Sequence, residues 1–350
     1  MSNSARFNLV LPSSALATTD DGWQDVQPEY IKVWASAVHS LREHPITVGP
    51  DRYTALVDWT STLQRHKRYY SALQYVHSGA ADKGAYIQRL LKANFPKRPA
   101  QNPIEVHARG VRNPQLLSIA ENVVYDSFFM MNIAAPSSCN FYRAMLLGDK
   151  IEPNVSLSHH AFESLHLVSL KEKWPSIAFL NLDRVIVWYR AVRQGALQIP
   201  SNPMERVLFS LFHISKIDMS PVEVVWLFYA FESLLQTSVG QNFALIVKRL
   251  CLLLEADDKQ SSLVRKLMRD LYDLRSAIVH GGYQITHPMH DAGLDKRVMD
   301  SFVRETRATD YGYALLISAV QKAIVKGWKY PRFAEVLEGE QITVTNDALQ

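Results

Sequence analysis

Residues 271–282, with the sequence LYDLRSAIVHGG, decide how the C-terminal half of this chain is expected to fold. They complete an amphipathic helical pattern that Gly281 and Gly282 stop, because glycine readily adopts the left-handed conformation that closes a helix. Four residues separate Arg275 from His280 in this helix end. A guanidinium suits phosphate oxygens, and histidine titrates near neutral pH. The pairing indicates chemistry on RNA.

Helical geometry places Arg275 on the apolar side of a helix predicted over residues 261–280. At about 100° per residue, one stripe collects Val264, Leu267, Met268, Leu271, Leu274 and Ile278. Arg275 falls inside that stripe. A charge directed toward a packed interface costs several kcal/mol unless it is paired or the interface is open to water. Two explanations therefore stand: a buried salt bridge with Glu232, or a polar cleft in which Arg275 binds a phosphate.

His280 lies five residues after Arg275, which is about 140° around an ideal helix. The two side chains share a face only if the last helical turn loosens, as Gly281 and Gly282 would allow. The negative end of the helix dipole favours the protonated form of a histidine at this position. A histidine before a terminating glycine is often only a cap, so the catalytic and structural interpretations both stay open.

The rest of the C-terminal half also predicts helices. Residues 220–223, Ser-Pro-Val-Glu, have the pattern of a capping box before the apolar run 224–235. Further helices are expected at 241–255, 261–280 and 310–329, the last with Asp310 as N-cap. With one helix before Ser220, they make a bundle of about five helices.

The N-terminal half reads as a mixture of helices and strands. Helical spacing is present in residues 51–77 and 86–91, and a helix is expected at 183–193. β-branched and aromatic runs predict extended structure within residues 104–170, in the segments IEVHARGV, NVVYDSFFMMNI and SHHAFESLHLVSL. The expected fold class is α+β overall, with an all-α helical bundle after a mixed α/β N-terminal domain.

Two prolines mark the predicted domain boundary. The segment IPSNP, residues 199–203, carries two prolines that block regular structure. We therefore expect an N-terminal recognition or sensing domain over residues 1–199, a helical domain over 200–335 and a tail over 336–350.

Composition narrows the class of protein. With 350 residues and 47% hydrophobic content, the chain should be well packed and globular. Cys139 and Cys251 are too few and too far apart for a disulfide framework or a thiolate metal site, which favours a reducing cytoplasm. We expect no secretion signal and no membrane span, because charges interrupt the longest apolar stretches. The motifs GxxxxGK, GxSxG and HExxH do not occur in the chain.

Basic residues are unevenly distributed. Residues 1–199 hold 21 Lys and Arg against 16 Asp and Glu, whereas the whole chain has a net charge of +4. The densest basic run contains Arg65, Lys67 and Arg68 beside two tyrosines. Such a run is usually a solvated helix face, and it is also a candidate RNA contact.

From about residue 203 to residue 332, the chain resembles a HEPN domain of the ApeA-like group. The matching segments are LYDLRSAIVHGG, the apolar helix VEVVWLFYAFESLL with an acidic residue near its end, and FALIVKRLCLLLE between them. The resemblance implies a homodimer whose Arg-x4-His motifs line one cleft and cleave RNA without metal or cofactor, leaving a 2′,3′-cyclic phosphate. It implies that His280 acts as general base or acid and that Arg275 holds the scissile phosphate.

The residues around the motif have supporting roles in this interpretation. Many members of the group have Asn or Asp after the arginine, whereas this chain has Ser276, whose hydroxyl can still donate and accept hydrogen bonds. Glu232 is expected to be a structural partner of Arg275. The flanking side chains of Tyr272, Asp273 and Tyr283 could contact RNA by stacking or hydrogen bonding, although exposed helix ends often carry such side chains.

Other histidines are weaker candidates: His159, His160, His166, His287 and His290. If the first three lie on a strand, His160 and His166 share a face, but without nearby cysteines no metal site is expected.

The leading hypothesis is a homodimeric, metal-independent endoribonuclease in a bacterial defence or toxin-like setting. Its partner would be RNA, with a trigger ligand or protein at the N-terminal domain. The alternatives are a catalytically silent dimerisation or binding module and a DNA-binding regulator.

Overall fold

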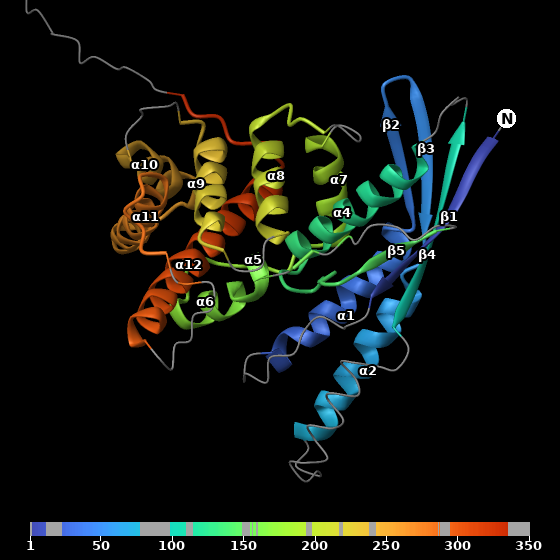
Figure 1. The fold of residues 1–350 in the computed structure, drawn as a ribbon, viewed down its shortest axis with the longest axis horizontal. Helices are drawn as coiled ribbons and strands as arrows, with labels where there is room; N and C mark the ends of the chain where they lie inside the picture. The colour runs from blue at the N-terminus through green and yellow to red at the C-terminus, as the bar shows by residue number, and fades with distance from the viewer. Residues whose placement is uncertain are drawn as a thin grey trace, which may run out of the picture.

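The computed structural model has an antiparallel sheet at one end of the molecule and helices over the rest (Figure 1), an α+β architecture as predicted. It describes residues 2–11, 23–77, 99–109, 115–148, 155, 157–158, 160–193, 198–216, 220–237, 243–285, 287 and 295–334.

The sheet has the order β2-β3-β4-β1-β5, and the neighbouring strands are antiparallel. Its strands are β1 (Ser2–Leu11), β2 (Glu43–Val48), β3 (Asp51–Val57), β4 (Ala100–Arg109) and β5 (Met145–Leu147). In β4, side chains alternate between buried and more exposed positions, which is the period of a strand with one face on the core. Helices α1 (Trp23–Ser40), α2 (Thr60–His77) and α4 (Leu116–Ala134) lie on that side of the sheet (Figure 1).

The N-terminal elements differ from the sequence prediction in three places. Residues 51–57 form β3 instead of the start of a helix, because Tyr53, Ala55 and Val57 are buried at a spacing of two. The run 122–133, expected to be extended, lies within helix α4. The prediction for 158–170 is also wrong, because α5 (His160–Glu163) and α6 (Leu165–Glu172) occupy most of it.

The physical reason for the α4 error is its burial. Almost the whole C-terminal part of α4 is buried, so the helix has no polar face to reveal a period of 3.6 residues. The strand at 104–109 and helix α7 (Leu182–Val192) are confirmed. The expected helix at 86–91 lies outside the described residues.

The C-terminal half forms the expected helical bundle. Its helices are α8 (Pro203–Ser215), α9 (Val222–Leu235), α10 (Phe243–Leu254), α11 (Asp258–Val279) and α12 (Lys296–Lys326). Helix α12 is longer than predicted, and its N-cap is Asp295, whose carboxylate accepts the amide hydrogen of Arg297, so Asp310 lies inside the helix. The first turns of α12 are largely exposed, which explains why the apolar pattern revealed only its later part.

The capping box predicted at residues 220–223 is wrong. Glu223 is buried, and its Oε2 accepts a hydrogen bond of 3.0 Å from the Tyr313 hydroxyl of α12. A capping box is present instead at the start of α11, where Asp257 and Gln260 each bond the backbone of the other.

One continuous core joins the two predicted regions. Buried side chains from the sheet, from α4 and from α12 belong to the same cluster. Gln321 of α12 donates to the carbonyl of Ile133 in α4 at 3.0 Å, and Ser318 donates to the carbonyl of Ser176. Helix α8 begins at Pro203, the last residue of the segment 199–203, and the division into separate domains stays a prediction. Among the helices of the described ranges, none is both long and apolar enough to cross a bilayer.

Candidate functional site

Helix α11 carries the candidate site and is anchored by its apolar side. Val264, Met268 and Leu271 are buried, and the helix packs against α9, α10 and α12. Arg275, one turn after Leu271, is half-buried on the same side. Its guanidinium carbon lies 5.7 Å from the centre of the Phe228 ring of α9, a cation–π contact. Arg275 therefore lies on the apolar side of the helix, as the helical spacing predicted.

Glu232 lies one turn after Phe228 on α9 and was expected to pair with Arg275. Burial raises the pKa of the Glu232 carboxyl, while the positive charge of Arg275 acts in the opposite direction. Within the part of the chain that the structure describes, no salt bridge of 4 Å or less joins the two side chains, and no hydrogen bond is made by the Arg275 guanidinium. The N–H groups of the half-buried Arg275 guanidinium are therefore available to an anionic ligand.

His280 caps the C-terminus of α11, and its side chain is exposed. Its amide still donates to the carbonyl of Ser276 at 3.0 Å, so the helical bonding continues to this residue. The chain turns only at Gly281, where φ is +74°, and Tyr283 then donates its amide hydrogen to Ala277 at 3.0 Å. The last turn is therefore not loosened before His280.

This regular ending keeps Arg275 and His280 on different sides of α11, about 140° apart. Arg275 points toward α9, whereas the His280 side chain lies in solvent at the helix end. A single copy of the chain does not bring the two side chains together.

Tyr283 belongs to a different part of the surface. Its hydroxyl donates to Oε2 of Glu305 at 2.9 Å, and burial together with Glu305 raises its pKa. It lines a groove of about 790 Å³ between α11 and the first half of α12, which Asp273 also lines. Glu305 was missed by the sequence analysis, because the early start of α12 was not predicted.

Tyr272 packs inside a row of aromatic rings and is not a free surface group. Its ring centre is 5.7 Å from Phe228 and 5.6 Å from Phe243. The guanidinium carbon of Arg269 lies 4.1 Å from the centre of the Phe243 ring. These contacts connect the Arg275 region to the surface between α10 and α11.

The basic run on α2 is divided between core and surface. Arg65 is buried, and its Nη2 donates to the carbonyl of Leu11 in β1 at 2.8 Å. Burial lowers the pKa of Arg65 to about 10. Its guanidinium fastens α2 to the sheet, so it does not offer an exposed contact to RNA, whereas Lys67 and Arg68 are exposed.

The predicted strand face with paired histidines does not form. His166 lies in helix α6, and its buried ring stacks on Phe179 at a centroid distance of 4.8 Å. Burial lowers its pKa to about 4. His287 is exposed, and His159 and His290 lie outside the described residues. No cluster of three or more metal-ligating His, Cys, Asp or Glu side chains occurs in the described ranges.

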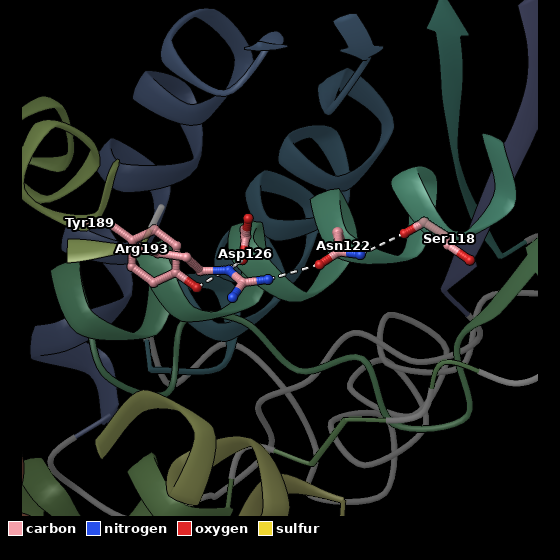
Figure 2. Close-up of polar contacts among 5 residues, drawn as sticks. All are labelled: Ser118, Asn122, Asp126, Tyr189 and Arg193. Atoms are coloured by element: carbon pink, nitrogen blue, oxygen red, sulfur yellow. Dashed lines mark hydrogen bonds and ion pairs between the residues drawn. The ribbon is translucent and has the colours of Figure 1, made fainter. Parts of the chain in front are cut away.

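A second polar cluster lies between α4 and α7 (Figure 2). Asp126 Oδ1 accepts hydrogen bonds of 2.9 Å from the Tyr189 hydroxyl and from Nε of Arg193. Arg193 Nη2 donates to Asn122 at 2.8 Å, and Asn122 donates to the carbonyl of Ser118 at 2.7 Å. Burial raises the pKa of Asp126, against the attraction of Arg193.

This cluster borders a small cavity of about 180 Å³ that His44 of β2 also lines. Its members satisfy one another, so the arrangement fastens α4 to α7 and needs no ligand. None of the patterns described for the sequence predicted this cluster. The available signal was the spacing of four between Asn122 and Asp126 and between Tyr189 and Arg193, which places each pair on one helix face.

Comparison of the chain with known protein families, with curated proteins and with solved structures found no match.

Proposed function

We propose that this protein is a metal-independent endoribonuclease in which Arg275 and His280 act on the scissile phosphate. The observation that carries the proposal is the environment of Arg275. It is a half-buried cation against Phe228, without a salt bridge to Glu232 in the described part of the chain. Its guanidinium keeps donors that an anion can use, and the resemblance to HEPN domains supplies that anion as an RNA phosphate.

The chemistry requires only the two side chains and the RNA. The 2′-hydroxyl of the RNA attacks the adjacent phosphorus, and its proton passes to one imidazole. The bond from phosphorus to the 5′-oxygen breaks, and that oxygen receives a proton from a second imidazole. The products are a 2′,3′-cyclic phosphate and a 5′-hydroxyl. Arg275 would neutralise the charge that develops on the phosphate oxygens.

Two copies of the chain would supply these groups. Because Arg275 and His280 diverge within one copy, the proposed site is completed by the motif of a second copy. The exposed start of α12 offers an apolar surface for such a contact, with Met299, Phe302 and Val303 exposed by 46%, 48% and 58%. Exposed apolar side chains grouped on one helix favour association.

The remaining parts of the proposal concern regulation and setting. A trigger ligand or protein would act on the N-terminal region, and Lys67 and Arg68 would contribute RNA contacts there. The resemblance suggests a bacterial defence or toxin-like role. Ser276 and Tyr283 would support the helix end that positions His280.

The decisive experiment measures cleavage of RNA in EDTA by the wild type, Arg275→Ala and His280→Ala. We expect cleavage by the wild type with cyclic-phosphate ends and a loss of at least about a hundredfold in each variant. The exposed Lys266 of α11, which lies outside the motif, gives the matched control Lys266→Ala. Equal cleavage by all four proteins would refute the assignment.

A catalytically silent dimerisation or binding module is the second candidate. It is favoured by the regular end of α11, which leaves Arg275 and His280 about 140° apart in the single chain. In that case no protein in the series cleaves RNA, while the wild type still forms dimers.

A further inference from the structure

A second groove lies between α10 and α11, on the side of α11 opposite the groove that holds Tyr283. Its volume is about 400 Å³, and it is lined by Phe243, Ala244, Val247, Lys248, Cys251, Ser261, Arg265 and Arg269. Lys248, Arg265 and Arg269 are exposed, and the described lining includes no acidic side chain. The groove is therefore positively charged.

The two grooves beside α11 differ in charge. Arg265 and Arg269 face α10, whereas the groove toward α12 is lined by Asp270 and Asp273 together with Lys266. Across the described ranges, no salt bridge involves Lys248, Arg265 or Arg269. Three cations without acidic partners on one side of a helix pair attract an anion along that groove.

An alternating row of cations and aromatic rings joins this groove to Arg275. Arg269 covers the Phe243 ring at 4.1 Å and lies 5.9 Å from the centre of Tyr272. Tyr272 contacts Phe228, and Arg275 lies over Phe228 at 5.7 Å. From Arg269 to Arg275 the distance along the helix axis is about 9 Å, which a few nucleotides of an RNA strand can span.

We infer that the groove between α10 and α11 binds the single-stranded RNA segment next to the scissile phosphate. This inference rests on the proposed function for the position of that phosphate. Lys248 and Arg265 contact the backbone phosphates, and the Arg269 guanidinium, stacked over Phe243, offers its outer face to a base. A base in a single strand is free to stack on such a surface, whereas a base in a duplex is already stacked between its neighbours.

The test uses the full chain carrying His280→Ala, so that the RNA is not cut during the measurement. Binding of a fluorescent single-stranded RNA of about twelve nucleotides is followed by anisotropy at several salt concentrations. Arg265→Glu combined with Lys248→Glu should weaken binding at least about tenfold and flatten its salt dependence, because phosphate contacts release counterions. Arg269→Gln tests the stacking position.

The matched control is Lys266→Glu, which reverses a charge on the same helix but faces the groove toward α12. It should change the RNA affinity by less than about twofold. Unchanged affinity in the double reversal would overturn the inference, and so would an equal loss per reversed charge in the control, because binding would then follow total charge. Competition by duplex RNA as strong as that by single-stranded RNA would also contradict it.

Failure of this inference and failure of the proposed function give different results. If the groove variants lose RNA affinity but the chain with His280 restored cuts no RNA in EDTA, the groove inference is supported and the nuclease assignment is wrong. If the groove variants bind RNA normally and, with His280 restored, cut it at the wild-type rate, the nuclease assignment is supported and the groove inference is wrong. Thermal unfolding of each variant confirms that the exposed substitutions leave the fold intact.

Discussion

Nε of Arg193 lies 2.9 Å from Oδ1 of Asp126 and joins helix α7 to helix α4 across 67 residues of sequence. The Arg193 side chain is only 6% exposed, and that of Asp126 is 20% exposed. Removing one member of a buried ion pair leaves the other charge without compensation. Breaking this contact should therefore lower the stability of the fold more than breaking an ion pair on the surface would.

Arg193→Met should lower the free energy of unfolding by about 3–5 kcal/mol, because Asp126 stays buried without its cation. Urea denaturation measures this loss. In the double variant Arg193→Met with Asp126→Leu, much of the loss should be recovered, since neither charge is then buried. A single variant within about 0.5 kcal/mol of the wild type would contradict the structural role.

His66 predicts sensitivity to acid. Its buried ring stacks on Trp34 at a centroid distance of 5.2 Å, and burial lowers its pKa to about 3, with a contribution from Arg65. Because the pKa of histidine in the unfolded chain is about 6.5, the folded state excludes the proton. The contribution of neutral His66 to the free energy of unfolding is fully present above pH 6.5 and is lost progressively as the pH falls toward 3.

Through His66 alone, the free energy of unfolding should be lower at pH 4.5 than at pH 7 by about 2–3 kcal/mol. His66→Phe keeps an aromatic ring beside Trp34 and removes the titration. The difference in unfolding free energy between pH 7 and pH 4.5 should therefore be smaller in the variant. An identical difference in the two proteins would show that His66 is not buried in the neutral form.

Under the proposed function, the exposed apolar residues at the start of α12 form the contact between two copies of the chain. Phe302→Asp should shift the protein from dimer to monomer in sedimentation experiments, because a charge in an apolar contact is costly. Thermal stability of the monomer should change little, since Phe302 is already 48% exposed. Leu252→Asp on α10, at a position that is 68% exposed, is the control and should remain dimeric.

A mixing experiment tests whether the site is shared between copies. Arg275→Ala and His280→Ala should each be inactive alone, and incubation of the two together should restore part of the RNA cleavage. Recovery should be partial, because a mixed dimer presents one intact arginine opposite one intact histidine and water must replace the second imidazole as proton donor. A site completed within a single copy would remain inactive after mixing.

The sequence predicted α11 within three residues at its start and one at its end, because a clear apolar stripe and a terminating glycine mark it. It could not identify α4, where burial on most sides removes the periodic signal. The contacts of Arg65 with Leu11 and of Arg193 with Asp126 depend on segments distant in the chain, which local patterns do not reveal. The position of Arg275 was predictable because it follows from helical spacing alone.

The amide of His280 bonds to Ser276, and this regular helix end makes the protein's concentration a control on its activity under the proposed function. A newly made chain would hold half of each site and could not cut RNA until it met a second copy. Specific activity would then increase with the amount of protein present, and dilution would act as an inhibitor. A small rise in expression would then be enough to start RNA degradation in a cell whose RNA was previously intact.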